Sequence, residues 1–162
     1  MVTGPDFARE LRPGEESQVE ALLHAAFEGP DEADLVRKLR KDRAIAGENV
    51  LVWDGEIIGY FALSHMVAPK GWLCLAPVAI KPSLQRRGYG KRMLGLLSEW
   101  ARLSQTPVVV LGDPQVYERA GFSRDLAANL ISPYPIEFTM LAGLKGPPPT
   151  KKLVYPAAFE TA

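Results

Sequence analysis

The stretch Gln85-Arg86-Arg87-Gly88-Tyr89-Gly90 decides the fold, because a strand is predicted to end just before it and a helix to begin within it. The preceding run, Trp72 to Ile80, is almost continuously apolar, which is typical of a strand covered on both faces. The following segment, Tyr89 to Leu103, carries apolar residues at helical spacing. Glycine lets an anion approach the backbone closely, and a helix N-terminus offers unpaired N–H groups. The sequence therefore predicts a phosphate-binding turn.

Positive charge gathers at this turn in a chain whose 19 basic and 19 acidic side chains cancel. The basic residues from 81 to 92 are Lys81, Arg86, Arg87, Lys91 and Arg92, and no acidic residue lies among them. Such a local excess favours a pyrophosphate ligand. Zero net charge argues against a nucleic-acid-binding protein or one that binds an anionic membrane surface, so we expect neither partner.

Two familiar phosphate loops do not fit the spacing of the turn. A Walker loop needs glycine where Gln85 stands and a hydroxyl residue where Arg92 stands. The dinucleotide fingerprint needs a third glycine where Met93 stands. The ligand is therefore expected to carry a pyrophosphate on another kind of α/β scaffold.

Elements on both sides of the turn complete an α/β pattern. The apolar run Val108 to Leu111 follows the helix, so strand, helix and strand form a βαβ unit with parallel strands. Upstream, Asp54-Gly55 predicts a tight turn between two antiparallel strands. The remaining predicted elements are helices over 15–27, 31–41 and 115–120, hairpin strands over 49–54 and 56–65, and weaker strands over 136–141 and 152–155.

The quoted stretch resembles the Gln/Arg-x-x-Gly-x-Gly/Ala signature of the GNAT-type N-acetyltransferases. Pro77-Val78-Ala79-Ile80 precedes it at the family's distance, and Tyr117-Glu118-Arg119-Ala120-Gly121-Phe122 resembles the family's second half, particularly in its YhbS-like branch. The resemblance implies an α/β fold of the acyl-CoA N-acyltransferase type, with a central splayed mixed β-sheet flanked by helices. It covers nearly the whole chain, so we expect one N-acetyltransferase domain over 1–162, with a signature core at 72–122 and C-terminal strands and tail at 136–162.

The resemblance also implies how acetyl-CoA is held. The backbone around Val78 and Ile80 would bond the pantetheine arm as an extra strand, and the turn would hold the pyrophosphate. Pro77, which has no N–H, makes an interrupted strand reasonable at this point. The expected cofactor-binding residues are Val78, Ala79, Ile80, Gln85, Arg86, Arg87, Gly88, Tyr89, Gly90 and Lys91.

The reaction implied is direct transfer of an acetyl group to a primary amine in a ternary complex, without a covalent enzyme intermediate. Tyr117 occupies the family's tyrosine position and is the expected acid for the departing thiolate. The base stays open among His65, Glu32 and a water chain, because the strand Leu75 to Ile80 has no carboxylate. That absence favours the alternative of a non-catalytic acyl-CoA-binding regulatory module.

Partners and location are less constrained by the sequence. Eight acidic residues and only Arg12 among basic ones lie between Glu10 and Asp34, which could attract a cationic amine, although two solvated helix faces account for most of them. The acceptor stays open between small-molecule and protein amines, as does the use of longer acyl groups. The apolar segment Leu153-Val154-Tyr155 could add a strand within one subunit or between two, so a homodimer stays open.

The small numbers of cysteines and histidines bear on the cellular compartment and on whether the protein binds a metal. Cys74 is the single cysteine, and the two histidines are too scattered for a zinc spacing, so no metal is expected. Neither a basic, apolar leader nor an apolar run of membrane-spanning length is visible. We therefore expect a cytoplasmic protein.

Overall fold

The computed structural model describes residues 8–160, which form a mixed sheet of six strands in the order β1-β2-β3-β4-β5-β6. Only β4 and β5 pair in parallel, and every other neighbouring pair is antiparallel. The strands are β1 Arg9–Glu10, β2 Ile45–Trp53, β3 Glu56–His65, β4 Leu73–Ile80, β5 Val108–Leu111 and β6 Thr139–Ala142. The splayed mixed sheet predicted from the sequence is therefore confirmed.

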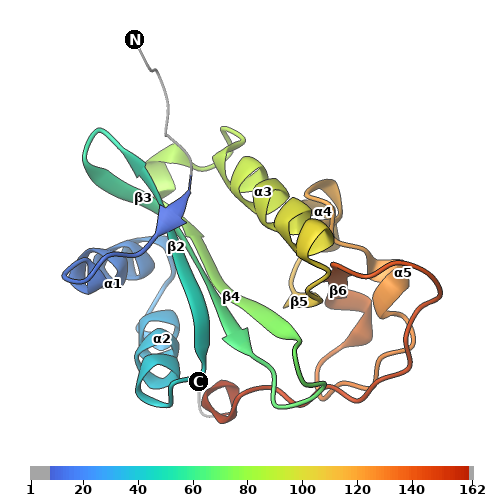
Figure 1. The fold of residues 1–162 in the computed structure, drawn as a ribbon. Helices are drawn as coiled ribbons and strands as arrows, with labels where there is room; N and C mark the ends of the chain where they lie inside the picture. The colour runs from blue at the N-terminus through green and yellow to red at the C-terminus, as the bar shows by residue number, and fades with distance from the viewer. Residues whose placement is uncertain (1–7, 161–162) are drawn as a thin grey trace.

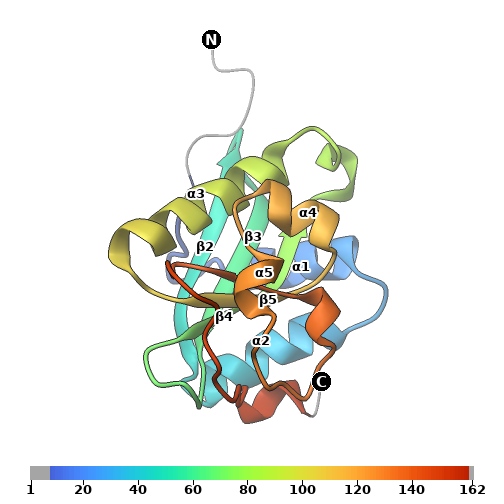
Figure 2. The ribbon, with the colours of Figure 1, turned by 90° about the vertical axis from the view of Figure 1, so that its right-hand side faces the viewer.

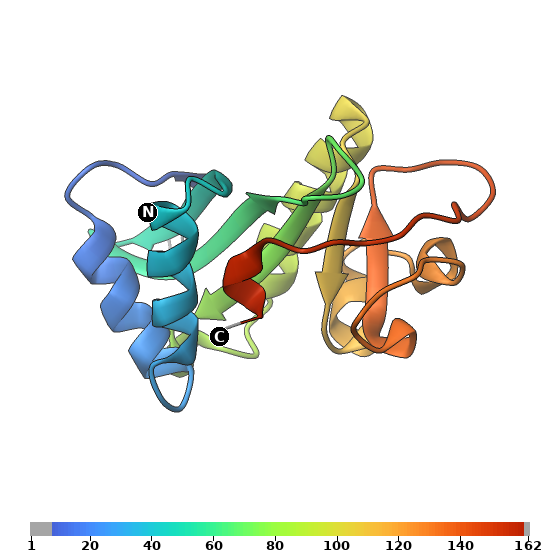
Figure 3. The same ribbon diagram turned by 90° about the horizontal axis from the view of Figure 1, so that it is seen from below.

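Helices cover both faces of this sheet (Figure 1). The helices are α1 Glu16–Ala26, α2 Asp31–Lys41, α3 Tyr89–Ser104, α4 Pro114–Arg119 and α5 Arg124–Ala127, and the 3-10 turns are η1 Pro82–Leu84, η2 Ile136–Phe138 and η3 Ala157–Phe159. Seen from below, α1 and α2 lie on one side of the strands, and the C-terminal segment runs across the molecule toward them (Figure 3). Of the helices within residues 8–160, none combines the length and the apolar character needed to cross a bilayer.

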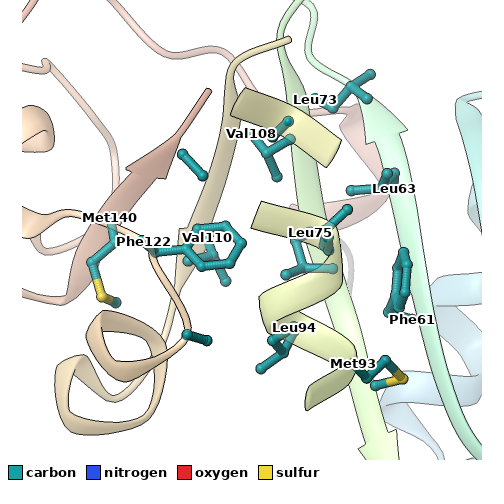
Figure 4. Close-up of a cluster of buried hydrophobic side chains, with 14 of the residues drawn as sticks. Phe61, Leu63, Leu73, Leu75, Met93, Leu94, Val108, Val110, Phe122 and Met140 are labelled. Atoms are coloured by element: carbon teal, nitrogen blue, oxygen red, sulfur yellow. The ribbon is translucent and has the colours of Figure 1, made fainter. Parts of the chain in front are cut away.

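The largest core lies between α3 and the sheet (Figure 4). Helical spacing puts Met93, Leu94 and Leu97 on the buried side of α3. The sheet contributes alternate residues because successive side chains of a strand point to opposite faces. Its members in this cluster include Phe61, Leu63, Leu73, Leu75, Val108, Val110 and Met140.

The opposite face of the sheet carries a second core under α1 and α2. Ala79 and the fully buried Tyr60 belong to it, packed with Leu23 of α1 and with Ala33 and Val36 of α2. Ala79 and Ala33 belong to one cluster, so α2 covers the sheet face on which the Ala79 side chain lies. The two faces of β4 are thus covered by different helices.

The sheet opens between its two parallel strands. β4 pairs with β5 only from Leu73 to Leu75, opposite Val108 to Val110. β4 then continues to Ile80 while pairing with β3 alone. Its last five residues therefore present a free edge on the side of β5.

The structure corrects several predicted boundaries. The hairpin turn is confirmed, with positive φ at both Asp54 (52°) and Gly55 (73°), but β2 begins at Ile45, four residues earlier than predicted. Residues 136–138 form a 3-10 turn, so the strand there begins only at Thr139. Residues 152–155 form isolated bridges and no strand, because the chain crosses the sheet end and meets Ala68 and Ile131 at single points.

Candidate active site

The free edge of β4 exposes particular backbone groups. The N–H of Lys81 donates to the carbonyl of Ile58 (2.7 Å), which fixes Lys81 and Ile58 as a hydrogen-bonded antiparallel pair. Such pairs alternate with pairs whose N–H and C=O groups point outward. By the observed register Ala79 bonds to Tyr60 of β3, whereas Val78 and Ile80 direct their backbone groups toward the opening. The opening therefore carries a strand edge ready for an extended, amide-bearing ligand.

A compact turn joins this edge to α3. Gln85 Nε2 donates to the carbonyl of Ile80 (2.9 Å), which ties the turn back to the end of β4. Arg86 and Gly88 both adopt positive φ, at 64° and 85°. The left-handed conformation at Gly88 is natural for glycine and strained for a residue with a Cβ, so this position favours glycine.

The N-terminus of α3 offers unpaired donors. The first intrahelical bond runs from the Arg92 N–H to the Gly88 carbonyl (3.0 Å), and no side chain caps the helix. The N–H groups from Gly88 to Lys91 therefore have no acceptor within the helix. Together with the helix dipole, they form a site suited to phosphate oxygens.

The basic side chains around the turn divide into two groups. Lys81 is bound to Glu56, with its Nζ 2.6 and 2.7 Å from the two carboxylate oxygens, so its charge is already neutralised. Arg86, Arg87 and Lys91 are exposed and form no ion pair with any of residues 8–160. These three are the cations placed to neutralise an anion at the helix N-terminus.

The side chain of Tyr89 has a packing role. Its ring meets that of Trp53 edge to face, with centroids 6.0 Å apart, at the margin of the core under α3. Gly90 lies over Ile80, because a Cβ there would stand 3.4 Å from an Ile80 side-chain carbon. These two contacts hold the start of α3 in place. The backbone N–H groups of Tyr89 and Gly90 are left available to a ligand.

Tyr117 stands across the opening, on the first helix after β5. Asp113 caps α4 by accepting a hydrogen bond from the Gln115 N–H (2.9 Å), which sets the helix start and the position of Tyr117. The Tyr117 ring contacts Phe122 edge to face at 5.9 Å and packs against the same core as Val78 and Ile80. Burial raises the pKa of the Tyr117 hydroxyl above its ordinary value. The phenol is therefore protonated at neutral pH and can act as a proton donor.

One residue of this site escaped the sequence reasoning. Gly112, between β5 and α4, has no room for a side chain, because a Cβ there would lie 2.5 Å from a ring carbon of Tyr117. The tyrosine ring thus lies directly on the Gly112 backbone. In the sequence, Gly112 is only a weak signal for this contact with Tyr117. Glycine is also common in turns, and the turn before Pro114 explains it equally well.

The structure separates the two side chains considered as bases. His65 is exposed and pairs with Leu73, at the end of β4 where the two parallel strands are still joined. Five residues separate Leu73 from Val78, or about 17 Å of strand. Glu32 lies in the first turn of α2, next to Ala33, which belongs to the same core cluster as Ala79 of β4. Within residues 8–160 no group of three or more His, Cys, Asp or Glu could hold a metal ion.

Helices α3 and α4 lie close together, as Figure 2 shows, and contact each other. Ser98 Oγ of α3 donates to the carbonyl of Ala120 at the end of α4 (2.5 Å). This bond fixes the position of α3, which carries the unpaired N–H groups, relative to α4, which carries Tyr117.

Comparisons with known proteins agree with this geometry. A sequence model of the Acetyltransferase (GNAT) family matches residues 16–122. The uncharacterized N-acetyltransferase YhbS of Escherichia coli K12 is 36% identical over 120 residues, which cover 68% of each chain. The crystal structure of E. coli YhbS in complex with CoA superposes with a TM-score of 0.85 and 26% identity, over 99% of this chain and 94% of that one.

A second solved structure leads to the same family. A GNAT family acetyltransferase from Brucella melitensis, in complex with acetyl-CoA, matches with a TM-score of 0.76 and 25% identity over 94% of this chain and 96% of that one. The family match spans well over half of the chain and includes both the Gly88 turn and Tyr117. The chain therefore belongs to the GNAT family of acetyltransferases.

Proposed function

We propose that this protein transfers the acetyl group of acetyl-CoA directly to a primary amine, with both substrates bound at once. The observation that carries the proposal is the parting of β4 and β5 after Leu75, which leaves the outward-facing backbone of Val78 and Ile80 beside the uncapped N-terminus of α3. The two relatives crystallised with CoA or acetyl-CoA support the choice of ligand. We further propose that residues 1–162 form one domain and that it acts in the cytoplasm.

The cofactor is proposed to lie along the opening. The amides of its pantetheine arm would bond to Val78 and Ile80, as an added strand bonds to a sheet edge. Its pyrophosphate would accept hydrogen bonds from the N–H groups of Gly88 to Lys91, with Arg86, Arg87 and Lys91 neutralising the charge. Gln85 would hold the turn in shape through its bond to Ile80, and Ala79 would support the edge through its pairing with Tyr60.

The transfer is proposed to proceed by direct attack. The neutral amine nitrogen forms a bond to the thioester carbonyl carbon, and the carbon–sulfur bond then breaks. The sulfur leaves with the electron pair and takes the proton of the Tyr117 hydroxyl, while the nitrogen gives its excess proton to water. Tyr117 regains a proton from solvent. The raised pKa of Tyr117 supports this role, because the hydroxyl carries its proton when the thiolate forms.

Calorimetry with coenzyme A tests the ligand assignment. Gly88→Val should weaken CoA binding strongly, because φ of 85° is incompatible with a β-branched residue and the turn would lose its shape. The matched control is Gly146→Val, which imposes the same backbone strain at φ 90° in the C-terminal loop. Equal CoA affinity in both variants would remove the pyrophosphate site from this turn.

Turnover tests the role of Tyr117. Tyr117→Phe keeps the ring on Gly112 and Phe122 but removes the proton donor, so kcat should fall by about 10²-fold or more while CoA affinity stays the same. Thiol release from acetyl-CoA in the presence of an amine panel measures kcat, and calorimetry measures CoA affinity. Full activity in Tyr117→Phe would end its assignment as the acid.

A non-catalytic acyl-CoA-binding module is the second candidate, and one observation favours it. The free half of β4, residues 76–80, carries no carboxylate to receive a proton from an amine. The test is to incubate the protein with acetyl-CoA and a mixed pool of amines and to look for acetylated products by mass spectrometry. Binding of acetyl-CoA without any acetylated amine would favour this alternative.

A further inference from the structure

A cavity of about 470 Å³ lies between α3 and the strands β1, β2 and β3. Its lining is largely apolar and includes the buried side chains of Phe61, Leu63, Met93 and Leu97. Leu73, at the start of β4, lines it as well. Binding sites for small organic molecules are mostly apolar and enclose about 300–1,000 Å³. The cavity therefore has the size and the lining of such a site.

The cavity is open at residue 47 of β2, which has no side chain. Gly47 pairs with Leu63 of β3, so a side chain at position 47 would lie on the same face of the sheet as that of Leu63. That face packs against α3. A Cβ added to Gly47 meets no atom within 4 Å, and the backbone there is not left-handed. A larger residue at this position would therefore fill the cavity without backbone strain.

Helix α3 separates the cavity from the proposed cofactor-binding opening between β4 and β5. Leu96 and Trp100 of α3 line the cavity, whereas Ser98, about 200° further around the helix, bonds to the chain at the end of α4. Figure 4 shows Phe61, which lines the cavity, and Phe122, which contacts the proposed acid, on opposite sides of α3. A ligand in the cavity would therefore occupy a different place from acetyl-CoA.

The rim of the cavity carries an unpaired negative charge and an exposed indole ring. Glu10 and Asn49 pair across β1 and β2, so their side chains lie on one face, and both line the cavity. The Glu10 carboxylate forms no ion pair with any of residues 8–160, and the neighbouring Arg9 is bound to Glu15 (2.8 Å). Trp100, which is 45% exposed, lines the same cavity from α3.

We propose that this cavity binds an organic cation with an apolar body, such as an aromatic quaternary ammonium ion. The apolar body would lie in the space beside Gly47, and the positive charge would lie near the Glu10 carboxylate and the Trp100 ring. The face of an indole attracts quaternary ammonium groups, and a carboxylate adds a charge of opposite sign. A quaternary nitrogen has no lone pair and cannot accept an acetyl group, so this ligand is distinct from the acceptor of the proposed reaction.

Calorimetry with the whole chain tests the class of ligand. The probe is benzyltrimethylammonium chloride, and the comparison compounds are benzyl alcohol, which carries no charge, and sodium benzoate, which carries the opposite one. We expect saturable binding of the cation, at least about tenfold tighter than that of either comparison compound. Equal affinity for all three compounds, or no binding of the cation, would overturn the proposal.

Variants test the place of binding. Gly47→Leu should abolish binding of benzyltrimethylammonium, because the added side chain fills the cavity. The matched control is Gly95→Leu, which adds the same side chain to α3 at a position that does not line the cavity and where a Cβ meets nothing within 4 Å. Retained binding in a folded Gly47→Leu protein would refute the assigned cavity.

A milder substitution tests the charge without changing the shape of the cavity. Glu10→Gln should weaken benzyltrimethylammonium binding by about threefold or more and leave benzyl alcohol binding unchanged. Glu99→Gln, which removes an acid paired with Arg102 on the surface of α3, is the control and should have no effect. Equal affinity for the cation in Glu10→Gln and in the parent protein would remove Glu10 from the site and overturn the proposal.

Two further measurements exclude other occupants. Saturating CoA should leave the affinity for benzyltrimethylammonium unchanged within about twofold, since α3 lies between the two sites; displacement by CoA would place the cation in the cofactor-binding opening. Sedimentation would detect a dimer, and a dimer that Gly47→Leu dissociates would assign the cavity to a second copy of the chain. Either result would overturn the proposal, and neither depends on whether the protein acetylates an amine.

Discussion

At the scale of single residues, the contact between Gly112 and Tyr117 sets the position of the proposed acid. A Cβ at position 112 would stand 2.5 Å from the tyrosine ring, closer than atoms can pack. We expect Gly112→Ala to push the ring away from the backbone and to lower kcat by about tenfold or more, since a small misplacement of a catalytic group is costly. CoA affinity, measured by calorimetry, should be retained because the proposed pyrophosphate site lies on α3.

Gly95 provides the comparison for that substitution. It lies within α3, where an added Cβ meets nothing within 4 Å beyond the helix's own backbone. Gly95→Ala should therefore raise the free energy of unfolding by about 0.5–1 kcal/mol and leave turnover unchanged. Normal kcat in Gly112→Ala would mean that the position of the Tyr117 ring has no effect on the reaction.

A position that needs a special backbone conformation was easier to predict than the surroundings of a single side chain. Gly88 stood out in the sequence because glycine, positive charge and a helix start coincide there, and the structure gives it a left-handed conformation that suits glycine. Glu32 could be named only as one acid of many, because the burial of its Oε1 depends on how α2 meets the sheet. No periodicity or spacing in one sequence encodes that contact.

At the scale of elements, the alternation along β4 gives a prediction for hydrogen exchange. The amides of Val78 and Ile80 point into the opening and should exchange quickly in the free protein, whereas the Ala79 amide, paired with Tyr60, should be protected. Saturating CoA should slow exchange at Val78 and Ile80 and leave Ala79 as it was. Exchange resolved at single residues by nuclear magnetic resonance provides the measurement, and equal protection of all three amides in the free protein would contradict the assigned edge.

A buried polar network attaches α2 to the sheet. Glu48 Oε1 accepts hydrogen bonds from the Tyr60 hydroxyl (2.6 Å) and from Arg40 of α2 (2.7 and 3.0 Å). Burial and the adjacent carboxylate raise the pKa of Tyr60, which keeps it a donor. Tyr60→Phe should lower the free energy of unfolding by about 1.5–3 kcal/mol in urea denaturation, the range for a bond to a charged group.

An exposed ion pair serves as the control for this network. Arg102 and Glu99 pair on the surface of α3, so Glu99→Gln should change stability by less than about 1 kcal/mol. Equal losses in Tyr60→Phe and Glu99→Gln would show that the network adds nothing to the attachment of α2.

Elements with a strong local signal matched their predicted bounds, and elements set by tertiary contact did not. α2 runs from Asp31 to Lys41 and β5 from Val108 to Leu111, as their apolar patterns predict. β1 is two residues long and exists because it pairs with Asn49 and Val50, a contact that its own sequence does not reveal. The start of β2 at Ile45 likewise depends on pairing with β3 across a bulge.

At the scale of the whole molecule, the C-terminal segment closes the sheet face opposite α3. Leu153 is 2% exposed within the core around Cys74, Val109 and Leu141, and Leu153→Ala should lower the free energy of unfolding by about 2–5 kcal/mol. Val154 is 36% exposed, so Val154→Ala should have a small effect in the same chemical denaturation experiment. Similar losses for both variants would contradict the buried placement of Leu153.

The overall arrangement was predictable because one unit dominates it. Once strand, helix and strand are recognised from Trp72 to Leu111, the parallel pair and the helix between its strands follow. The path of the last residues does not follow from any such unit. Residues 152–155 are apolar enough for a strand, but they meet the rest of the chain only at single bridges, and their place depends on a core assembled from distant segments.

In the sheet, three residue pairs join β4 to β5 and divide it into a lobe of four strands, β1 to β4, and a lobe of two, β5 and β6. A cofactor bound along both sides of the opening would connect these two lobes. The molecule would then be more rigid with the cofactor than without it. In a cell short of acetyl donors, the empty protein would be the more easily bent and the more readily cut by proteases.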